Sequence, residues 1–253
     1  MKTRTKGNGA ASTARVTYTS AKWANANIII SNKDTGSVLC VHRMAEKSRK
    51  MMRDKQLGHA KRKPQDKQPV ELMIDTLYQF KEEVSGSLYG IPAVAPKMAT
   101  TRAFKFMDGF SMVDAKGFCH VMSAGKDIEE TNELVPIIAP PVKGLNYKEK
   151  LLAGELGWSE DEMLEALKVP HKYGACLRED DVRIGPAGGT ADIRYRAAFN
   201  TWKIPFTVRY NTNQVSLEQL ITAIDDGGQM VGICENRPEK SGNNWGTYTV
   251  EGC

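Results

Sequence analysis

The sequence predicts an α+β domain in which helices lie on one face of an antiparallel sheet. Two observations near the C-terminus are the basis of this prediction. From Trp202 to Tyr210, a large apolar residue occupies every second position, as in a strand with one buried face. A helix is predicted next, because Ser216 and Gln219 have the capping-box spacing and apolar residues recur at i, i+3, i+4 and i+7 from Leu217.

Length and composition are consistent with one such domain. The chain has 253 residues, of which 41% are hydrophobic, enough to form a core without disulfides. We expect a flexible basic arm at 1–15 and a single domain at 16–253 that contains a basic loop (55–69) and a helical insertion (143–180). The five cysteines contain no C-x-x-C pair, so we expect free thiols in an intracellular protein. No apolar run reaches the roughly 18 residues of a membrane span, so we expect no membrane partner.

The N-terminal half predicts short elements of both kinds. An apolar β-branched run, a turn-like segment and a second apolar run resemble a hairpin, and helix-forming residues with helical spacing follow. In chain order, we expect a hairpin of 27–31 and 38–41, helices at 44–53, 70–80 and 96–107, and a turn at 86–92.

The C-terminal half predicts mainly strands around the helical insertion. Short strands are expected at 118–122, 134–138, 190–196, 230–234 and 247–250, with helices at 147–156 and 159–169 inside the insertion. The strand at 202–210, the helix after Ser216 and the strand at 230–234 form a β-α-β unit. A right-handed crossover places both strands in one sheet with the helix behind it, as in ferredoxin-like and RNA-recognition-like folds.

Positive charge is concentrated in two segments. The net charge is +5, yet residues 43–67 have a net +7 and the first fifteen residues a net +4, so the rest of the chain is acidic. This asymmetry favours a polyanionic partner, although a solvated charged loop would have the same composition. The candidate phosphate-binding residues in this region are Arg43, Lys47, Arg49, Lys50, Arg53, Lys55, Lys61, Arg62 and Lys63.

A second cationic group is predicted on the face of the sheet. Its members are Arg194, Arg196, Lys203, Arg209, Arg237, Lys240 and Trp245. Arginine binds phosphate through two donors while an aromatic ring stacks on bases, so such a face suits a single-stranded nucleic acid. The alternative is an exposed sheet of mixed charge with Trp245 packed inward.

No established catalytic motif occurs in the chain. The signatures H-E-x-x-H, G-x-x-x-x-G-K-[ST], G-x-G-x-x-G and G-x-S-x-G are absent, and the four histidines are far apart in sequence. We therefore expect no metal site, no cofactor and no enzymatic activity. One alternative is a metal-independent ribonuclease, in which His42 beside Arg43 acts as general acid or base. The other interpretation of His42 is a residue at a strand end or a phosphate contact.

Several segments resemble known proteins. TADIRYRAAF, TVRYN, SLEQLITAI and VGICENRPEKSGNNWGTYTV, from Thr190 to Val250, are similar to the C-terminal part of a family of uncharacterised tailed-phage proteins and, more distantly, to the RAMP superfamily of CRISPR-associated proteins. VLCVHRMAEKSRKMMRDKQLGHAKR is similar to the phage proteins alone. The resemblance implies a modified RNA-recognition-like fold whose copies assemble side by side along a nucleic-acid strand.

The leading hypothesis is a non-enzymatic, phage-type protein that binds single-stranded RNA or DNA and assembles as an oligomer or filament. A phage-encoded protein of this kind is expected in the host cytoplasm. The structural alternative is a virion or filament protein whose arm and loops tie neighbouring subunits together.

Overall fold

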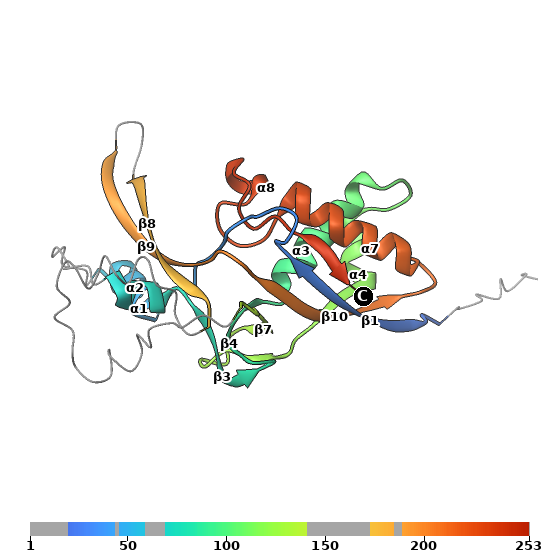
Figure 1. Ribbon diagram of the computed structural model, residues 1–253, viewed down its shortest axis with the longest axis horizontal. Helices are drawn as coiled ribbons and strands as arrows, with labels where there is room; N and C mark the ends of the chain where they lie inside the picture. The colour runs from blue at the N-terminus through green and yellow to red at the C-terminus, as the bar shows by residue number, and fades with distance from the viewer. Residues whose placement is uncertain (1–19, 44–45, 59–68, 141–172, 185–188, 253) are drawn as a thin grey trace, which may run out of the picture.

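A computed structural model describes residues 20–43, 46–58, 69–140, 173–184 and 189–252 of the chain. Three antiparallel sheets organise these residues (Figure 1). In spatial order, sheet A contains β11 (Thr249–Gly252), β1 (Trp23–Ser31), β10 (Lys203–Asn211) and β5 (Cys119–Met122). Sheet B contains β2 (Leu39–Val41), β9 (Thr190–Phe199) and β8 (Ala175–Ile184), and sheet C contains β3 (Tyr78–Val84), β4 (Ser87–Pro92), β7 (Glu133–Pro136) and β6 (Gly125–Lys126).

Helices cover one face of sheet A. In chain order the helical elements are α1 (Glu46–Gln56), α2 (Pro69–Asp75), α3 (Val94–Ala103), η1 (Phe104–Phe106), α4 (Met112–Phe118), α7 (Leu217–Asp226), η2 (Gly227–Val231) and α8 (Pro238–Ser241). Figure 1 shows α3, α4 and α7 grouped on one side of β1 and β10. The predicted alternation in β10 is confirmed, because Ile204, Phe206 and Val208 are buried in the core while Lys203 and Arg209 are exposed.

The predicted capped helix is confirmed as α7. The Gln219 N–H donates to Ser216 Oγ (3.1 Å), and the Ser216 N–H donates to Gln219 Oε1 (3.0 Å). These two bonds satisfy backbone and side-chain groups at the helix start, and Leu220, Ala223 and Ile224 are buried. The local sequence therefore fixes both the start of α7 and the face that it turns to the core.

Strand β1 gives sheet A its central pair with β10. The two strands pair over nine residues, with Asn25 opposite Arg209 and Asn27 opposite Thr207. Directly opposite residues share a face of the sheet, so these side chains lie together on the face away from the helices. Ile28 and Ile30 lie on the other face, in the core.

Sheet B is dominated by a long hairpin of β8 and β9, which Figure 1 shows projecting away from sheet A. The short helix α2 packs on one of its faces, where the Ala197 N–H donates to Thr76 Oγ1 (2.9 Å). The loop that contains Glu235 contacts sheet B at β2, where the Glu235 N–H donates to the Cys40 carbonyl (3.0 Å). We call this segment the C-terminal loop.

Several predicted elements differ from those observed. The segments 27–31 and 38–41 are strands but not a hairpin, since β1 pairs with β10 and β11 whereas β2 pairs with β9. The helix predicted at 70–80 ends at Asp75, and the turn predicted at 86–92 is strand β4. Strands β3 and β4 form because they bury Phe80 and Ile91, and only Ser85 and Gly86 turn between them, both with positive φ.

The strand predicted at 230–234 is also wrong. Residues Gly227–Val231 form η2, a π-helical continuation of α7, and the strand that closes sheet A is β11. Gly227 and Gly228 permit this continuation, because a Cβ would lie 2.8 Å from the Ala99 backbone at the first position and 2.2 Å from the Tyr248 carbonyl at the second. The two glycines serve close packing, and they do not end the helix.

Other predicted segments are confirmed or lie outside the described residues. The helix expected near 96–107 and the strands expected near 118–122 and 134–138 are present as α3, β5 and β7. The basic arm, most of the basic loop and both helices of the insertion lie outside the described residues, while the end of the insertion range, from Ala175, belongs to β8. In the described part of the chain, Cys40, Cys119, Cys176 and Cys234 are free thiols, and no helix there is long and apolar enough to cross a membrane.

Candidate nucleic-acid interface

The basic segment around α1 is partly structural. Arg43 is only 8% exposed, and its guanidinium forms an ion pair with Glu129. Arg49 binds the same carboxylate at 3.0 Å. Lys50 and Arg53 are exposed on α1, which also contains Lys47 and Lys55, whereas Lys61, Arg62 and Lys63 lie outside the described residues. Arg43 and Arg49 therefore share the carboxylate of Glu129, and their role as phosphate contacts stays a prediction.

The two arginines of β9 do not share one environment. Arg194 is exposed, but Arg196 is only 5% exposed and lies 3.2 Å from the Asp180 carboxylate. Arg196 was expected on the solvent side of the strand. It is buried because the C-terminal loop packs against β2 beside it, bringing Glu235 close to the face that Arg196 occupies.

Trp245 packs against an arginine that the sequence did not single out. The guanidinium carbon of Arg178 lies 4.1 Å from the centroid of the Trp245 ring. Arg178 is opposite Arg196 in the β8–β9 ladder, so Arg178, Arg194 and Arg196 occupy one face of sheet B. We call these three residues, with Trp245, the arginine face. Asp180 belongs to the same face, and its carboxylate binds Arg178 at 2.8 Å. This carboxylate reduces the net positive charge of the arginine face.

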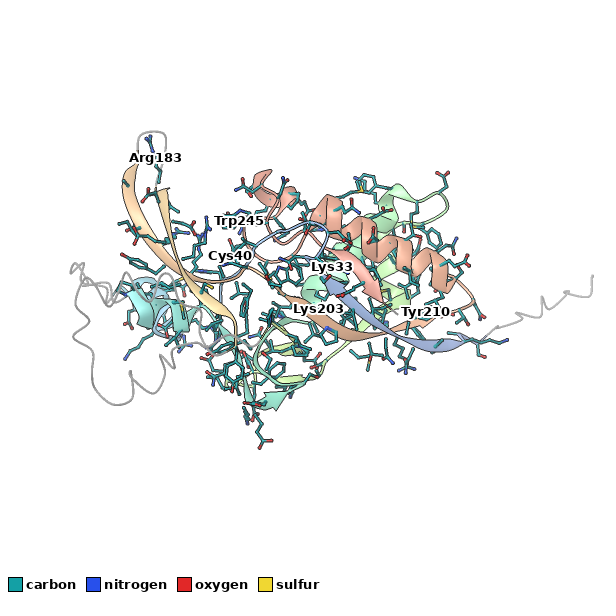
Figure 2. All side chains as sticks on the ribbon, in the orientation of Figure 1. Lys33, Cys40, Arg183, Lys203, Tyr210 and Trp245 are labelled. Carbon is teal, nitrogen blue, oxygen red and sulfur yellow. The ribbon has the colours of Figure 1, made fainter. Side chains whose placement is uncertain are left out.

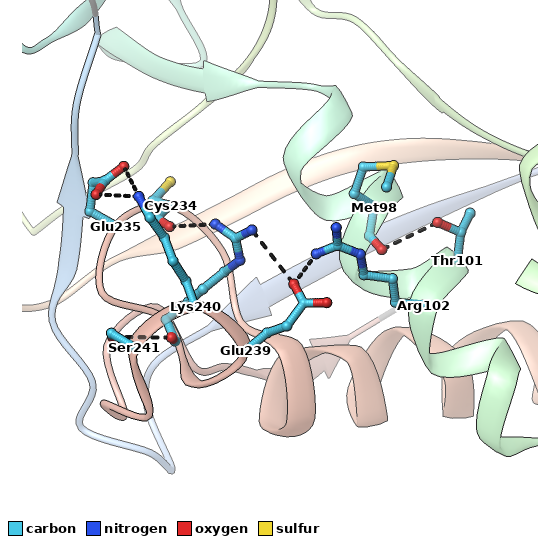
Figure 3. A network of polar contacts seen from close by, with 9 residues as sticks. Met98, Thr101, Arg102, Cys234, Glu235, Glu239, Lys240 and Ser241 are labelled. Atoms are coloured by element: carbon cyan, nitrogen blue, oxygen red, sulfur yellow. Dashed lines mark hydrogen bonds and ion pairs between the residues drawn. The ribbon is translucent and has the colours of Figure 1, made fainter.

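The cations of the C-terminal loop are bound to carboxylates. Lys240 binds Glu235 at 2.8 Å, and Arg237 lies 3.6 Å from Glu239, which also contacts Arg102. Figure 3 shows Glu235 with Lys240 and Glu239 with Arg102. The contact of Glu239 with Arg102 holds α8 against α3. The role of Arg237 and Lys240 as phosphate contacts stays a prediction.

The predicted cations therefore do not form a single face. Figure 2 shows Lys203 on sheet A well separated from Arg183 on the β8–β9 hairpin. Lys203 and Arg209 belong to sheet A, while Arg194 and Arg196 belong to sheet B. Lys203 is also paired, at 2.7 Å, with Glu251.

The face of sheet A away from the helices brings together a different set of groups. We call it the open face, and define it by the outward side chains of β1, β10 and β5: Trp23, Asn25, Asn27, Ile29, Lys203, Thr207, Arg209, His120 and Met122. The outward positions of these three strands contain no carboxylate. Among the candidate cations on this face, Arg209 is not paired with a carboxylate in the described residues, so the part of the face around Arg209 is cationic.

Trp23, Arg209 and His120 form a cluster toward one end of the open face. The Arg209 guanidinium carbon lies 5.1 Å from the centroid of the Trp23 ring, within cation–π range. The centroid of the His120 ring, on β5, lies 5.5 Å from the centroid of the Trp23 ring, on β1, and the two ring planes are tilted by 42°. His120 is held in place because its Nε2 donates to the Gly117 carbonyl (3.1 Å) and its Nδ1 accepts from Lys97 Nζ (3.2 Å).

The chemistry of this arrangement suits unpaired bases. The exposed Trp23 ring and the Arg209 guanidinium are planar groups on which a base stacks, and Arg209 also donates to phosphate. Asn25, Asn27 and Thr207 add hydrogen-bonding groups, with Thr207 Oγ1 donating to Asn27 Oδ1 (2.8 Å). Sequence reasoning selected Arg209 but missed Trp23 and His120. The period-2 pattern WANANIII was a signal for Trp23, because it places Trp23, Asn25 and Asn27 on one face.

His42 has an unusual electrostatic environment. Partial desolvation is the largest cause that lowers the pKa of His42, and the cations Arg196, Arg194 and Lys240 act in the same direction while Glu235 opposes them. The imidazole is therefore neutral over more of the acidic range than an ordinary histidine. The described residues contain no cluster of histidine, cysteine and carboxylate side chains that could hold a metal ion. The ribonuclease alternative stays a prediction.

Comparisons with known proteins find similarity among solved structures. No family model matches the chain, and no curated protein matches it. Among solved structures, the chain is similar to the crystal structure of Cmr6 from Pyrococcus furiosus, with a TM-score of 0.34 and 10% identity over 90% of this chain and 99% of that chain. This TM-score is too low to establish a shared fold, so the resemblance to phage and RAMP proteins stays a prediction.

Proposed function

We propose that this protein binds single-stranded nucleic acid on the open face of sheet A and catalyses no reaction there. The observation that supports the proposal most strongly is the contact of Trp23 with Arg209 and His120 on a face to which β1, β10 and β5 contribute no carboxylate. A duplex hides its bases inside the stack, whereas a single strand exposes them to an aromatic platform. The proposal therefore includes a preference for single strands.

The connectivity of sheet A supports a finer proposal about the fold. The elements around it follow the order β1, α3, β5, β10, α7, β11, and the four strands lie in the spatial order β11-β1-β10-β5 with antiparallel neighbours. We propose that sheet A is a ferredoxin-like or RNA-recognition-like unit, in which two helices pack on one face. The face opposite the helices is then the platform for bases.

Other cations supply further contacts to the backbone in this proposal. Arg194 on the arginine face and Lys50 and Arg53 on α1 are exposed, and no carboxylate partner is found for them in the described part of the chain. Each phosphate neutralised on a single strand contributes about −0.7 to the slope of log K against log salt. Affinity is therefore expected to fall as salt is raised.

Fluorescence anisotropy with a labelled oligonucleotide tests the proposal. We expect a single strand to bind more tightly than the duplex of the same sequence, and Arg209→Glu to weaken binding. Lys116→Glu is the matched control, because Lys116 is an exposed cation on α4, on the helical side of sheet A. Equal affinity for single strand and duplex, or equal effects of the two charge reversals, would contradict the proposal.

Phage origin, the choice between RNA and DNA, and assembly into an oligomer or filament stay predictions. Light scattering of the protein without nucleic acid separates the binding proposal from the structural alternative. Large assemblies that form without nucleic acid would favour a virion or filament protein.

A further inference from the structure

A groove of about 580 Å³ lies beside β5, the strand at one edge of sheet A. Its apolar wall includes Pro92, Val94 and Met122, and its polar groups include Lys97, His120 and Asn132. The volume falls within the roughly 300–1,000 Å³ of pockets that hold small molecules. The groove is thus large enough for a ligand of nucleotide size, and it combines apolar and polar walls.

The groove is continuous with the open face. His120 belongs to both, since its ring contacts Trp23 at 5.5 Å and also lines the groove. Met122 is shared in the same way, because it lies opposite Thr207 on the open face and lines the groove. A strand that stacks on Trp23 therefore reaches the groove across the His120 ring without leaving the protein surface.

Lys97 gives the groove a cation suited to phosphate. Its Nζ donates to His120 Nδ1 at 3.2 Å, and no ion pair engages it in the described ranges. An ammonium group has three donors, so the bond to His120 leaves others for phosphate oxygens. Glu133 also lines the groove and is exposed, so the phosphate is expected on the Lys97 side.

We propose that this groove receives one nucleotide of the bound strand, with its base against Val94 and Met122 and its phosphate on Lys97. The inference rests on the proposed function of the open face, and it assigns the groove beside that face to the same strand. The base enters an apolar slot instead of stacking in the open, while the preceding base remains on Trp23.

The substitution Val94→Trp tests the inference by filling the groove. Val94 is 57% exposed at the first residue of α3, so a larger side chain there has room without disturbing the core. Val113→Trp is the matched control, because Val113 is 73% exposed on α4 and does not line the groove. We expect Val94→Trp to weaken single-strand binding about tenfold, the effect of one lost base contact, and Val113→Trp to leave it unchanged.

A second variant and a second probe keep the test independent of folding. Lys97→Met is expected to reduce the salt slope by about 0.7, because one phosphate contact is lost. Adenosine monophosphate, titrated by calorimetry, is expected to bind the wild type and Val113→Trp but not Val94→Trp.

The outcomes separate this inference from the proposed function. If Val94→Trp and Lys97→Met bind like the wild type while Trp23→Ala binds more weakly, the groove inference is overturned and the open-face proposal stands. If the wild-type protein binds no single strand, the proposed function fails and the groove inference with it.

Discussion

The substitution Trp23→Ala tests the stacking role of the open face. The Trp23 ring is 39% exposed at the first residue of β1, where it contacts Arg209 and His120. The stacking of one base on an aromatic side chain contributes about 1–3 kcal/mol. The dissociation constant is therefore expected to rise about 5- to 150-fold, since each 1.4 kcal/mol is a factor of about ten.

The same substitution is expected to change stability little. The contacts that Trp23 loses are an exposed cation–π pair, which contributes about 0.5–1 kcal/mol, and the edge of the His120 ring. Urea denaturation measures this loss directly. A small change in the free energy of unfolding together with a large change in affinity separates a binding role from a structural one.

The assay is anisotropy with a labelled single strand of about ten nucleotides, within the usual site sizes of such proteins. Phe106→Ala is the matched control, because Phe106 is an exposed aromatic residue in η1, outside the open face. The double variant with Arg209→Ala should lose less affinity than the sum of the single variants, since the two residues are in contact. If Trp23→Ala binds as tightly as the wild type, the stacking argument is refuted.

Three further predictions follow from the packing. Glu129→Ala leaves the buried Arg43 guanidinium unpaired, so urea denaturation should show a loss of about 3 kcal/mol, and an unchanged midpoint would contradict the burial of the pair. Ser216→Ala removes the acceptor for the Gln219 N–H and should cost about 1 kcal/mol in thermal unfolding, whereas an unaffected Tm would mean that the cap is not formed. Burial acts to raise the pKa of Asp127, but hydrogen bonds from Asn132 and Thr131 prevail and lower it below its ordinary 3.8. The stabilising contribution of the Asp127 carboxylate is therefore complete above pH 3.8 and is lost as pH falls through the depressed pKa. Asp127→Asn should make the free energy of unfolding less dependent on pH in that range. An equally steep pH dependence in the variant would contradict this role of Asp127.

Features that depend on local sequence were predictable. The alternation in β10 and the capping box of α7 lie within about ten residues each, so sequence alone indicated the buried face and the helix start. Strand pairing was not predictable in the same way. The segments 27–31 and 38–41 are close in sequence, yet each pairs with a strand more than 150 residues later, and no local pattern specifies such partners.

Two glycines illustrate how tertiary packing overrides a local signal. Gly227 and Gly228 usually indicate the end of a helix, which led to the strand prediction at 230–234. In the structure they allow η2 to approach the backbones of Ala99 and Tyr248. The helical prediction at 70–80 failed for a related reason, because Phe80 is buried in sheet C beside Gly90 and Gly125.

The candidate site was predictable only in part. Lys203 and Arg209 point outward, as the alternation predicts, but the ion pairs of Arg43 and Arg196 depend on carboxylates that are distant in sequence or on another strand. Charge counting identifies cations without identifying their partners. Trp23 and His120 were missed because their meeting with Arg209 requires the assembly of three strands.

Photo-crosslinking tests most directly where a nucleic acid binds. A single strand containing 5-iodouracil, irradiated in complex with the protein and digested, identifies the contacting peptides by mass spectrometry. We predict crosslinks within β1, at Trp23, and within β5, at His120, because both rings lie on the open face. Crosslinks confined to α4 and α7, on the opposite side of sheet A, would contradict the account.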